Sequence, residues 1–191
     1  MSSTNSSANV GSHATTPKRS SPRTSSMPDR RVVVSDTSPL LNLSLIGRLD
    51  LLESQFAEIT VPTQVWGELT DGAEGVDALR DLRKREFLTL VEVDRTDLFV
   101  EIHHELDLGE TAAICCAIER DADLVLLDER DGRRVARRHD LSLTGVIGVL
   151  LRGAQAGDLD LEAELTALRE AGFWISDDLF STVLDRADDS T

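Results

Sequence analysis

The chain has 191 residues, 40% of them hydrophobic, which is enough for one globular domain with a sizeable core. No apolar run approaches the ~18–20 residues of a membrane span, and the amino-terminal stretch lacks the apolar segment of a secretory signal. We therefore expect no membrane association. Residues 1–31 hold five basic side chains against one acidic, so residues 32–191 carry −19 within a total charge of −15. Because nucleic acid is also negatively charged, the net charge of this domain opposes binding to it.

The basic residues are almost all arginines, since the only lysines are Lys18 and Lys84. Few lysines and many acids are typical of proteins from salt-accumulating organisms, where ~1 M salt shortens the Debye length to ~3 Å and screens self-repulsion. We expect a halophilic archaeal source, with an ordinary acidic cytosolic protein as the alternative. The adjacent Cys115 and Cys116 cannot staple the fold by a disulfide. They indicate buried thiols in a reducing cytoplasm.

The chain divides into a polar tail and one patterned domain. Residues 1–28 are rich in Ser, Thr, Asn and Pro without apolar periodicity, and we expect them to be disordered, with Met27 as an alternative start. Beyond them, short apolar runs predict strands at 31–35, 57–61, 88–92, 124–127 and 141–144. Helical patterns occupy 39–46, 49–54, 62–69, 74–85, 97–104, 107–120, 130–138, 145–156, 160–171 and 177–187. This alternation predicts a three-layer α/β/α domain over residues 31–188 with a mostly parallel sheet.

The first strand ends at a single carboxylate, Asp36. Thr37-Ser38-Pro39 follows, which is typical of a helix start with Ser38 as the N-cap and Pro39 as the first helical residue. Asp36 therefore lies at the carboxyl end of a strand, the edge of an open α/β sheet where binding sites are built. Taken alone, it could equally be a helix cap.

Further acids follow the other strands or open the helices beside them: Glu68, Glu110, Asp128, Glu129 and Asp131. Each has a structural explanation as a cap, a solvated position, an anion at a helix N-terminus or part of a polar turn. Carboxylates that converge repel one another, however, and a hard cation stabilises such a cluster. Ligands that are all oxygen favour Mg²⁺ or Mn²⁺ over zinc, and such an ion can polarise a phosphate and supply a hydroxide.

Several motifs occur in a characteristic order: Val-Ser-Asp36-Thr-Ser-Pro-Leu, Val-Pro-X-X-Val-X-X-Glu68-Leu, Leu-Asp-Leu-Gly-Glu110-Thr-Ala-Ala-Ile and Leu-Leu-Asp128-Glu129-Arg-Asp131-Gly-Arg-Arg-Val-Ala. Together with Ile-Gly-Arg-Leu-Asp-Leu-Leu at 46–52 and Thr-Gly-Val-Ile-Gly-Val-Leu-Leu at 144–151, they resemble the PIN-domain family. The likeness covers about Arg31 to Arg186. It is strongest to a branch of small prokaryotic predicted nucleic-acid-binding proteins similar to VapC-type toxins.

The resemblance implies a set of site residues. Asp36, Glu68 and Glu110 match the first three acidic positions of the family. The fourth position stays open between the acids that follow the 124–127 strand: Asp128, Glu129 and Asp131. The hydroxyl of Thr37 or Ser38 would orient Asp36 or a metal-bound water.

The resemblance also implies an activity and partners. It indicates a magnesium- or manganese-dependent endoribonuclease, in which one or two metals activate water for in-line attack and leave 5′-phosphate and 3′-hydroxyl ends. A toxin role, a small antitoxin protein and a homodimer are implied as well. The alternative is a catalytically silent PIN-like module that binds RNA or a protein.

Two further features bear on RNA binding. A basic helix carries arginines at helical spacing: Arg130, Arg133, Arg134, Arg137 and Arg138. These could bind phosphates, with a solvated or ion-paired face as the alternative. We expect Trp66 and Trp174 to lie in the core or in an interface, with a role as base-stacking platforms as the alternative.

Overall fold

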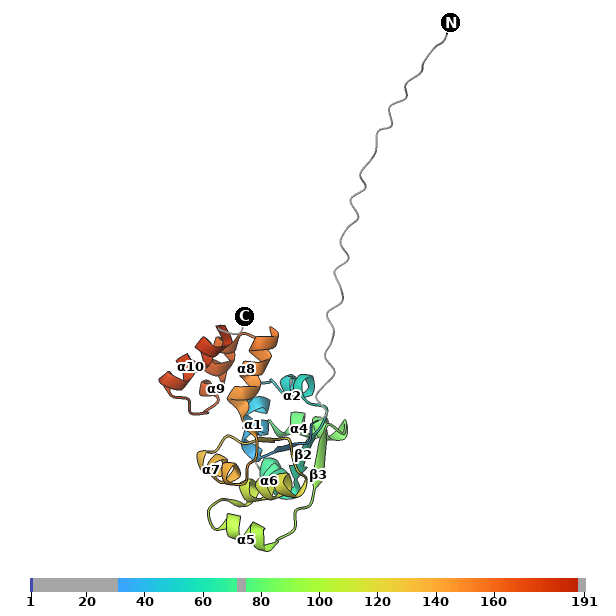
Figure 1. The fold of residues 1–191 in the computed structure, drawn as a ribbon, viewed down its shortest axis with the longest axis vertical. Helices are drawn as coiled ribbons and strands as arrows, with labels where there is room; N and C mark the ends of the chain where they lie inside the picture. The colour runs from blue at the N-terminus through green and yellow to red at the C-terminus, as the bar shows by residue number, and fades with distance from the viewer. Residues whose placement is uncertain (2–30, 72–74, 189–191) are drawn as a thin grey trace.

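Among the described residues, five short strands form one parallel sheet in the computed structural model (Figure 1). The structure describes residues 1, 31–71 and 75–188. Of residues 1–28, for which we expect disorder, all but Met1 lie outside the described residues. The strands are β1 (Val33–Ser35), β2 (Ile59–Pro62), β3 (Leu88–Val91), β4 (Leu124–Leu126) and β5 (Leu143–Thr144). Their order is β3-β2-β1-β4-β5, and every pairing is parallel. The predicted α/β fold class is confirmed.

Strand β1 is the central strand of the sheet, and its carboxyl end lies beside the carboxyl ends of β2 and β4. All of its residues are buried, as expected for a parallel strand covered by helices on both faces. Val34 is in register with Thr60 of β2 on one side and Val125 of β4 on the other. Residues that directly follow these three strands therefore meet at one edge of the sheet.

Helices flank the sheet on both faces (Figure 1). They are α1 (Thr37–Leu45), α2 (Asp50–Gln55), α3 (Thr63–Asp71), α4 (Val76–Lys84), α5 (Asp97–His103), α6 (Leu108–Glu119), α7 (Arg130–Arg138), α8 (Val146–Ala156), α9 (Leu161–Glu170) and α10 (Asp177–Asp188). None of these helices is both long and apolar enough to cross a membrane.

Helix α6 is buried along most of its length against β1 and β2. Its small side chains include Ala112, Ala113 and two free thiols, Cys115 and Cys116, all fully buried. Burial raises the pKa of both thiols to about 11, so they remain protonated. The expectation that the cysteines are small core residues is confirmed.

The start of α1 differs from the prediction. The helix begins at Thr37, so Asp36 and not Ser38 occupies the N-cap position, and Pro39 is the third helical residue. The first-turn N–H groups of a helix have no partner within the helix, so proline is tolerated throughout that turn and does not fix the first residue.

The last three helices gather at one end of the molecule, opposite α5 (Figure 1). Helix α8 packs against α1, α2, α9 and α10 and follows the edge strand β5. Ser176 caps the start of α10, because its Oγ accepts a hydrogen bond from Leu179 N at 3.2 Å.

Candidate functional site

Asp36 lies at the carboxyl end of β1 with 3% of its surface exposed. Its backbone N–H donates to the Leu126 carbonyl at 3.0 Å, which fixes the residue against β4. Although Asp36 holds the N-cap position of α1, its side chain makes no capping hydrogen bond. Burial raises its pKa to about 7; the Thr37 N–H opposes this shift, and the charges of Asp107, Glu110 and Glu68 add to it. The carboxylate is therefore costly to keep ionised unless a cation compensates it.

Glu68 projects from α3, the helix that follows β2. The Thr37 hydroxyl donates to Glu68 Oε2 at 2.8 Å, so Thr37 orients Glu68 and not Asp36. The start of α6 approaches the same carboxylate closely, since a Cβ on Gly109 would lie 2.4 Å from Glu68 Oε2. Glycine at this position thus leaves space for the Glu68 side chain.

Glu110 stands in the first turn of α6 with 6% of its surface exposed. Burial, followed by the charges of Asp107 and Glu129, raises its pKa to about 7. Its Oε1 atom is buried and has no hydrogen-bond partner. A Cβ on Gly132 would lie 2.5 Å from this oxygen, so α7 also reaches the cluster.

Asp107 is a member of the site that sequence reasoning missed. It is the N-cap of α6, and its Oδ1 accepts a hydrogen bond from Glu110 N at 2.8 Å. Its charge raises the pKa values of both Asp36 and Glu110. The signal in the sequence was the Asp-X-X-Glu spacing at the start of the helix, which is typical of an N-terminal cap.

The three candidates for the fourth acid point in different directions. Asp128 Oδ1 accepts a hydrogen bond from Val146 N at 2.9 Å and caps α8, while its buried Oδ2 has no partner. Burial raises the pKa of Asp128 to about 6. Glu129 is exposed and acts electrostatically on both Glu110 and Asp128. Asp131 is exposed and pairs with Arg134 at 3.4 Å. Of the three, Glu129 is the one coupled to the main cluster.

The donor set suits a hard cation. No three His, Cys, Asp or Glu side chains of the described residues stand close enough to form a ready-made metal cage. Every available donor is an oxygen, however, and Glu110 Oε1 and Asp128 Oδ2 are buried without partners. Mg²⁺ characteristically binds through one or two carboxylates and keeps several waters. Asp36 and Glu110, with Glu129 nearby, therefore fit such an ion.

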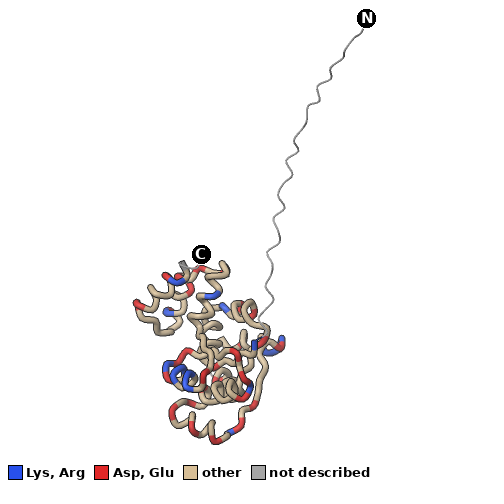
Figure 2. The backbone as a smooth tube through the Cα atoms, in the orientation of Figure 1, with Lys and Arg blue, Asp and Glu red and all other residues tan. Residues whose placement is uncertain are grey.

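The arginines of helix α7 form one cluster along the chain (Figure 2), but they do not all make the same kind of contact. Arg134 and Arg138 both pair with Glu105, at 3.1 and 2.6 Å. Arg133 Nη1 donates to the Leu127 carbonyl at 2.6 Å. Arg130 and Arg133 line a hollow beside the acids, whereas Arg137 is exposed. The single basic face expected from spacing thus consists of an ion-paired part and a part directed at the hollow.

The fold and these carboxylates define an α/β protein with an acidic site at the carboxyl edge of a parallel sheet. The family model DUF3368, a PIN domain, matches residues 32–189, and the chain belongs to the PIN-domain family. PIN domains are generally metal-dependent nucleases, so the fold is of nuclease type. No curated protein matches the chain.

Proposed function

We propose that the protein is an endoribonuclease that uses Mg²⁺ or Mn²⁺. The observation that carries the proposal is the buried acid pair Asp36 and Glu110, both with a pKa raised to about 7 and both within the electrostatic reach of Asp107. Buried ionised carboxylates destabilise a fold unless a cation or hydrogen bonds compensate them, and perturbed carboxylates cluster at catalytic sites. The all-oxygen donor set matches a hard cation and a phosphodiester substrate.

Each acid has a distinct part in this proposal. Asp36 and Glu110 would hold the cation, with Glu129 on the exposed side. A bound Mg²⁺ or Mn²⁺ polarises the phosphate and lowers the pKa of its water. Glu68, oriented by the Thr37 hydroxyl, accepts the proton of the attacking water. Asp107 positions Glu110 by capping its backbone N–H, and Asp128 positions α8. The fourth acidic position is assigned to Glu129.

We extend the proposal to a VapC-like toxin with a small antitoxin partner, acting as a homodimer in the cytoplasm of a halophile. The ordered motifs support the toxin role, and two buried free thiols support a reducing compartment. The net charge of −15 and the scarcity of lysine support a saline cytoplasm.

A cleavage assay on unstructured RNA tests the activity. Titration with Mn²⁺ and Mg²⁺ at about 2–3 M KCl keeps the acidic surface screened. Asp36→Asn should abolish cleavage and any growth arrest, whereas Asp131→Asn, at an exposed ion-paired acid, should retain both. Equal cleavage by Asp36→Asn and the parent protein would refute the proposal.

The lack of a three-carboxylate cage among the described side chains favours one other candidate, a silent module that binds RNA or a protein. This candidate predicts RNA or protein binding without metal-dependent cleavage.

A further inference from the structure

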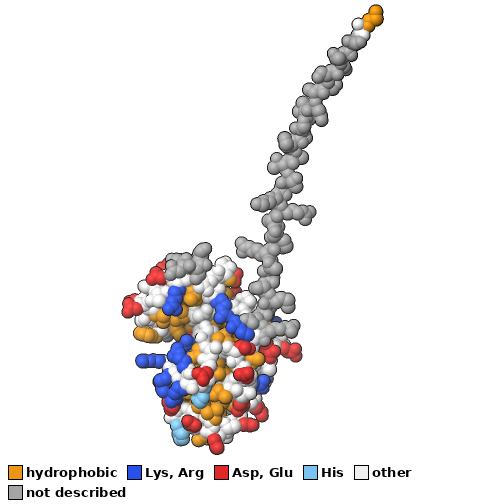
Figure 3. Space-filling view, viewed as in Figure 1, with side chains coloured by type: hydrophobic (Ala, Val, Ile, Leu, Met, Phe, Trp, Pro, Cys, Tyr) orange, Lys and Arg blue, Asp and Glu red, His pale blue; other side chains and the backbone are white. Residues whose placement is uncertain are grey.

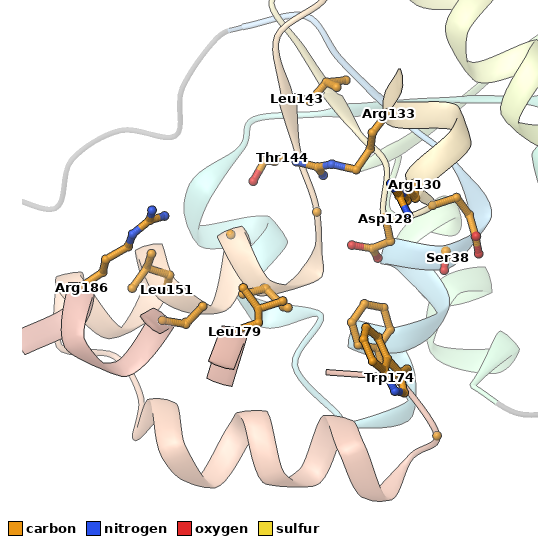
Figure 4. A pocket seen from close by; sticks show the side chains of 17 residues that line it. Ser38, Asp128, Arg130, Arg133, Leu143, Thr144, Leu151, Trp174, Leu179 and Arg186 are labelled. Atoms are coloured by element: carbon orange, nitrogen blue, oxygen red, sulfur yellow. The ribbon is translucent and has the colours of Figure 1, made fainter. Parts of the chain in front are cut away.

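A hollow of about 760 Å³ opens beside the acid cluster and reaches the carboxy-terminal helices (Figure 4). Ser38, Asp128 and Glu129 line the end nearest the cluster. The other walls come from α8, from α10 and from the turn at 172–174 that precedes α10. Its volume is typical of a site for a small organic group. An RNA strand lying across the acids would have this space next to its reacting phosphate.

Trp174 lines this hollow with 82% of its surface exposed, so of the two predicted places, core or interface, the core is wrong. Its backbone is nevertheless well anchored. Phe173 N donates to the Leu168 carbonyl at 3.1 Å, and Arg169 Nη2 donates to the Ile175 carbonyl at 2.8 Å. The Arg169 guanidinium also lies 4.4 Å from the centroid of the Phe180 ring. The indole is therefore presented to solvent from a fixed turn, which reduces the entropy lost on binding.

Arg130 and Arg133 also line the hollow, beside Asp128 and Glu129. In Figure 4, Trp174 lies at the same end of the hollow as Ser38, Asp128 and Arg130, while Leu151 and Leu179 lie at the other end. Figure 3 shows the basic side chains over α7 directly below apolar side chains of the carboxy-terminal helices. An exposed aromatic ring beside arginines is the combination by which proteins hold single-stranded nucleic acid.

Charge favours an uncharged base over a phosphate as the group held in the hollow. A chain of net charge −15 gains little from attracting the RNA backbone, and high salt weakens phosphate contacts further. Stacking of an uncharged base on an indole is not subject to this loss. The continuity of the hollow with Asp128 and Glu129 also places its occupant next to the proposed catalytic acids.

We propose that the hollow is a subsite for one unpaired nucleobase of the RNA substrate, which stacks on Trp174 while Arg130 contacts the adjoining phosphate. The inference rests on the proposed ribonuclease function and makes single-stranded RNA the substrate. A base held in a duplex cannot present its face to the indole, so paired RNA is excluded from the subsite.

Fluorescence tests the subsite without requiring cleavage. Trp66→Phe leaves Trp174 as the single tryptophan, and Trp66 lies outside the hollow, with Arg83 5.1 Å from its ring centroid. In an Asp36→Asn background with Mg²⁺, an unstructured RNA 12-mer should quench Trp174 emission. The same strand with abasic residues, or annealed to its complement, should quench it far less. A second measurement uses fluorescence anisotropy with labelled RNA and leaves Trp66 unchanged. Trp174→Ala should bind the RNA about 5- to 150-fold more weakly than the protein that keeps Trp174, and Trp174→Phe should bind it nearly as well.

Three outcomes would overturn the inference. The first is an equal RNA affinity of Trp174→Ala and Trp174→Phe. The second is equal quenching by the abasic strand and the intact strand. A third is that Trp174→Ala changes the mass in sedimentation as well as RNA affinity, which would assign the ring to a protein interface. RNA cleavage is a separate readout. A protein that cleaves RNA but shows any of these three results keeps its proposed function without the subsite.

Discussion

Replacing Asp36 by Asn should stabilise the metal-free protein at alkaline pH while it removes activity. The pKa of Asp36 is about 7 in the fold, against 3.8 for the free side chain. Because this pKa is raised, the native state keeps a proton that the unfolded state has already released. Stability therefore falls as pH rises from about 4 to about 7, and the loss persists above that range.

The magnitude follows from the size of the shift. At about 1.4 kcal/mol per pKa unit, the destabilisation due to Asp36 grows from below about 1 kcal/mol at pH 4 to about 4 kcal/mol at pH 8. Asparagine has nearly the same shape and no charge, so Asp36→Asn removes this penalty. For a domain of this size, the melting temperature should rise by about 8–16 °C at pH 8 and by only about 1–2 °C at pH 4.

Thermal melts in EDTA at about pH 4, 6 and 8 and about 1 M KCl would measure the effect, with the salt screening surface repulsion. Asp131→Asn is the matched control, because this acid is exposed and ion-paired. Added Mg²⁺ should stabilise the parent protein at pH 8 and narrow its difference from Asp36→Asn. A gain that is independent of pH, or an equal gain in Asp131→Asn, would refute the burial argument.

Three other changes test individual contacts. Gly109→Ala would put a Cβ 2.4 Å from Glu68 Oε2, so RNA cleavage should fall by about 10-fold or more with an unchanged circular dichroism spectrum; Gly67→Ala, with no atom within 4 Å, should keep full activity. Asp107→Ala and Asp107→Asn both remove the charge that repels Asp36 and Glu110, but only Asp107→Ala also removes the cap on Glu110 N, so Asp107→Ala should be about 1 kcal/mol less stable than Asp107→Asn in chemical denaturation. Glu105→Gln releases Arg134 and Arg138, so filter binding should show tighter RNA binding with a steeper salt dependence; unchanged affinity would remove these arginines from the RNA path.

The fold was predictable because its signals are local. Apolar runs of three to five residues, each followed by a helical pattern, lead directly to a parallel sheet. The position of Asp36 at the sheet edge followed from the same pattern, as it comes directly after β1. The first residue of α1 did not, because proline fits anywhere in a first turn.

The directions of neighbouring acids were not predictable in the same way. Asp128 and Glu129 are adjacent in sequence, yet one caps α8 and the other acts on Glu110. Which of two successive side chains faces a given element depends on the turn between β4 and α7 and on the position of α8. The exposure of Trp174 likewise depends on how the last helices pack against the sheet. Such tertiary relations leave no periodic trace in a single sequence.

The order of features along the chain has a consequence for how such a protein can diverge. The acids assigned to chemistry precede residue 130, whereas the indole and most other lining residues of the hollow come from residues 143–186. If the hollow holds a base as proposed, RNA binding and bond cleavage would be encoded in separable stretches of the gene. Changes in the turn at 172–174 would then alter RNA binding while the carboxylates stay intact, so binding could diverge by short mutational paths.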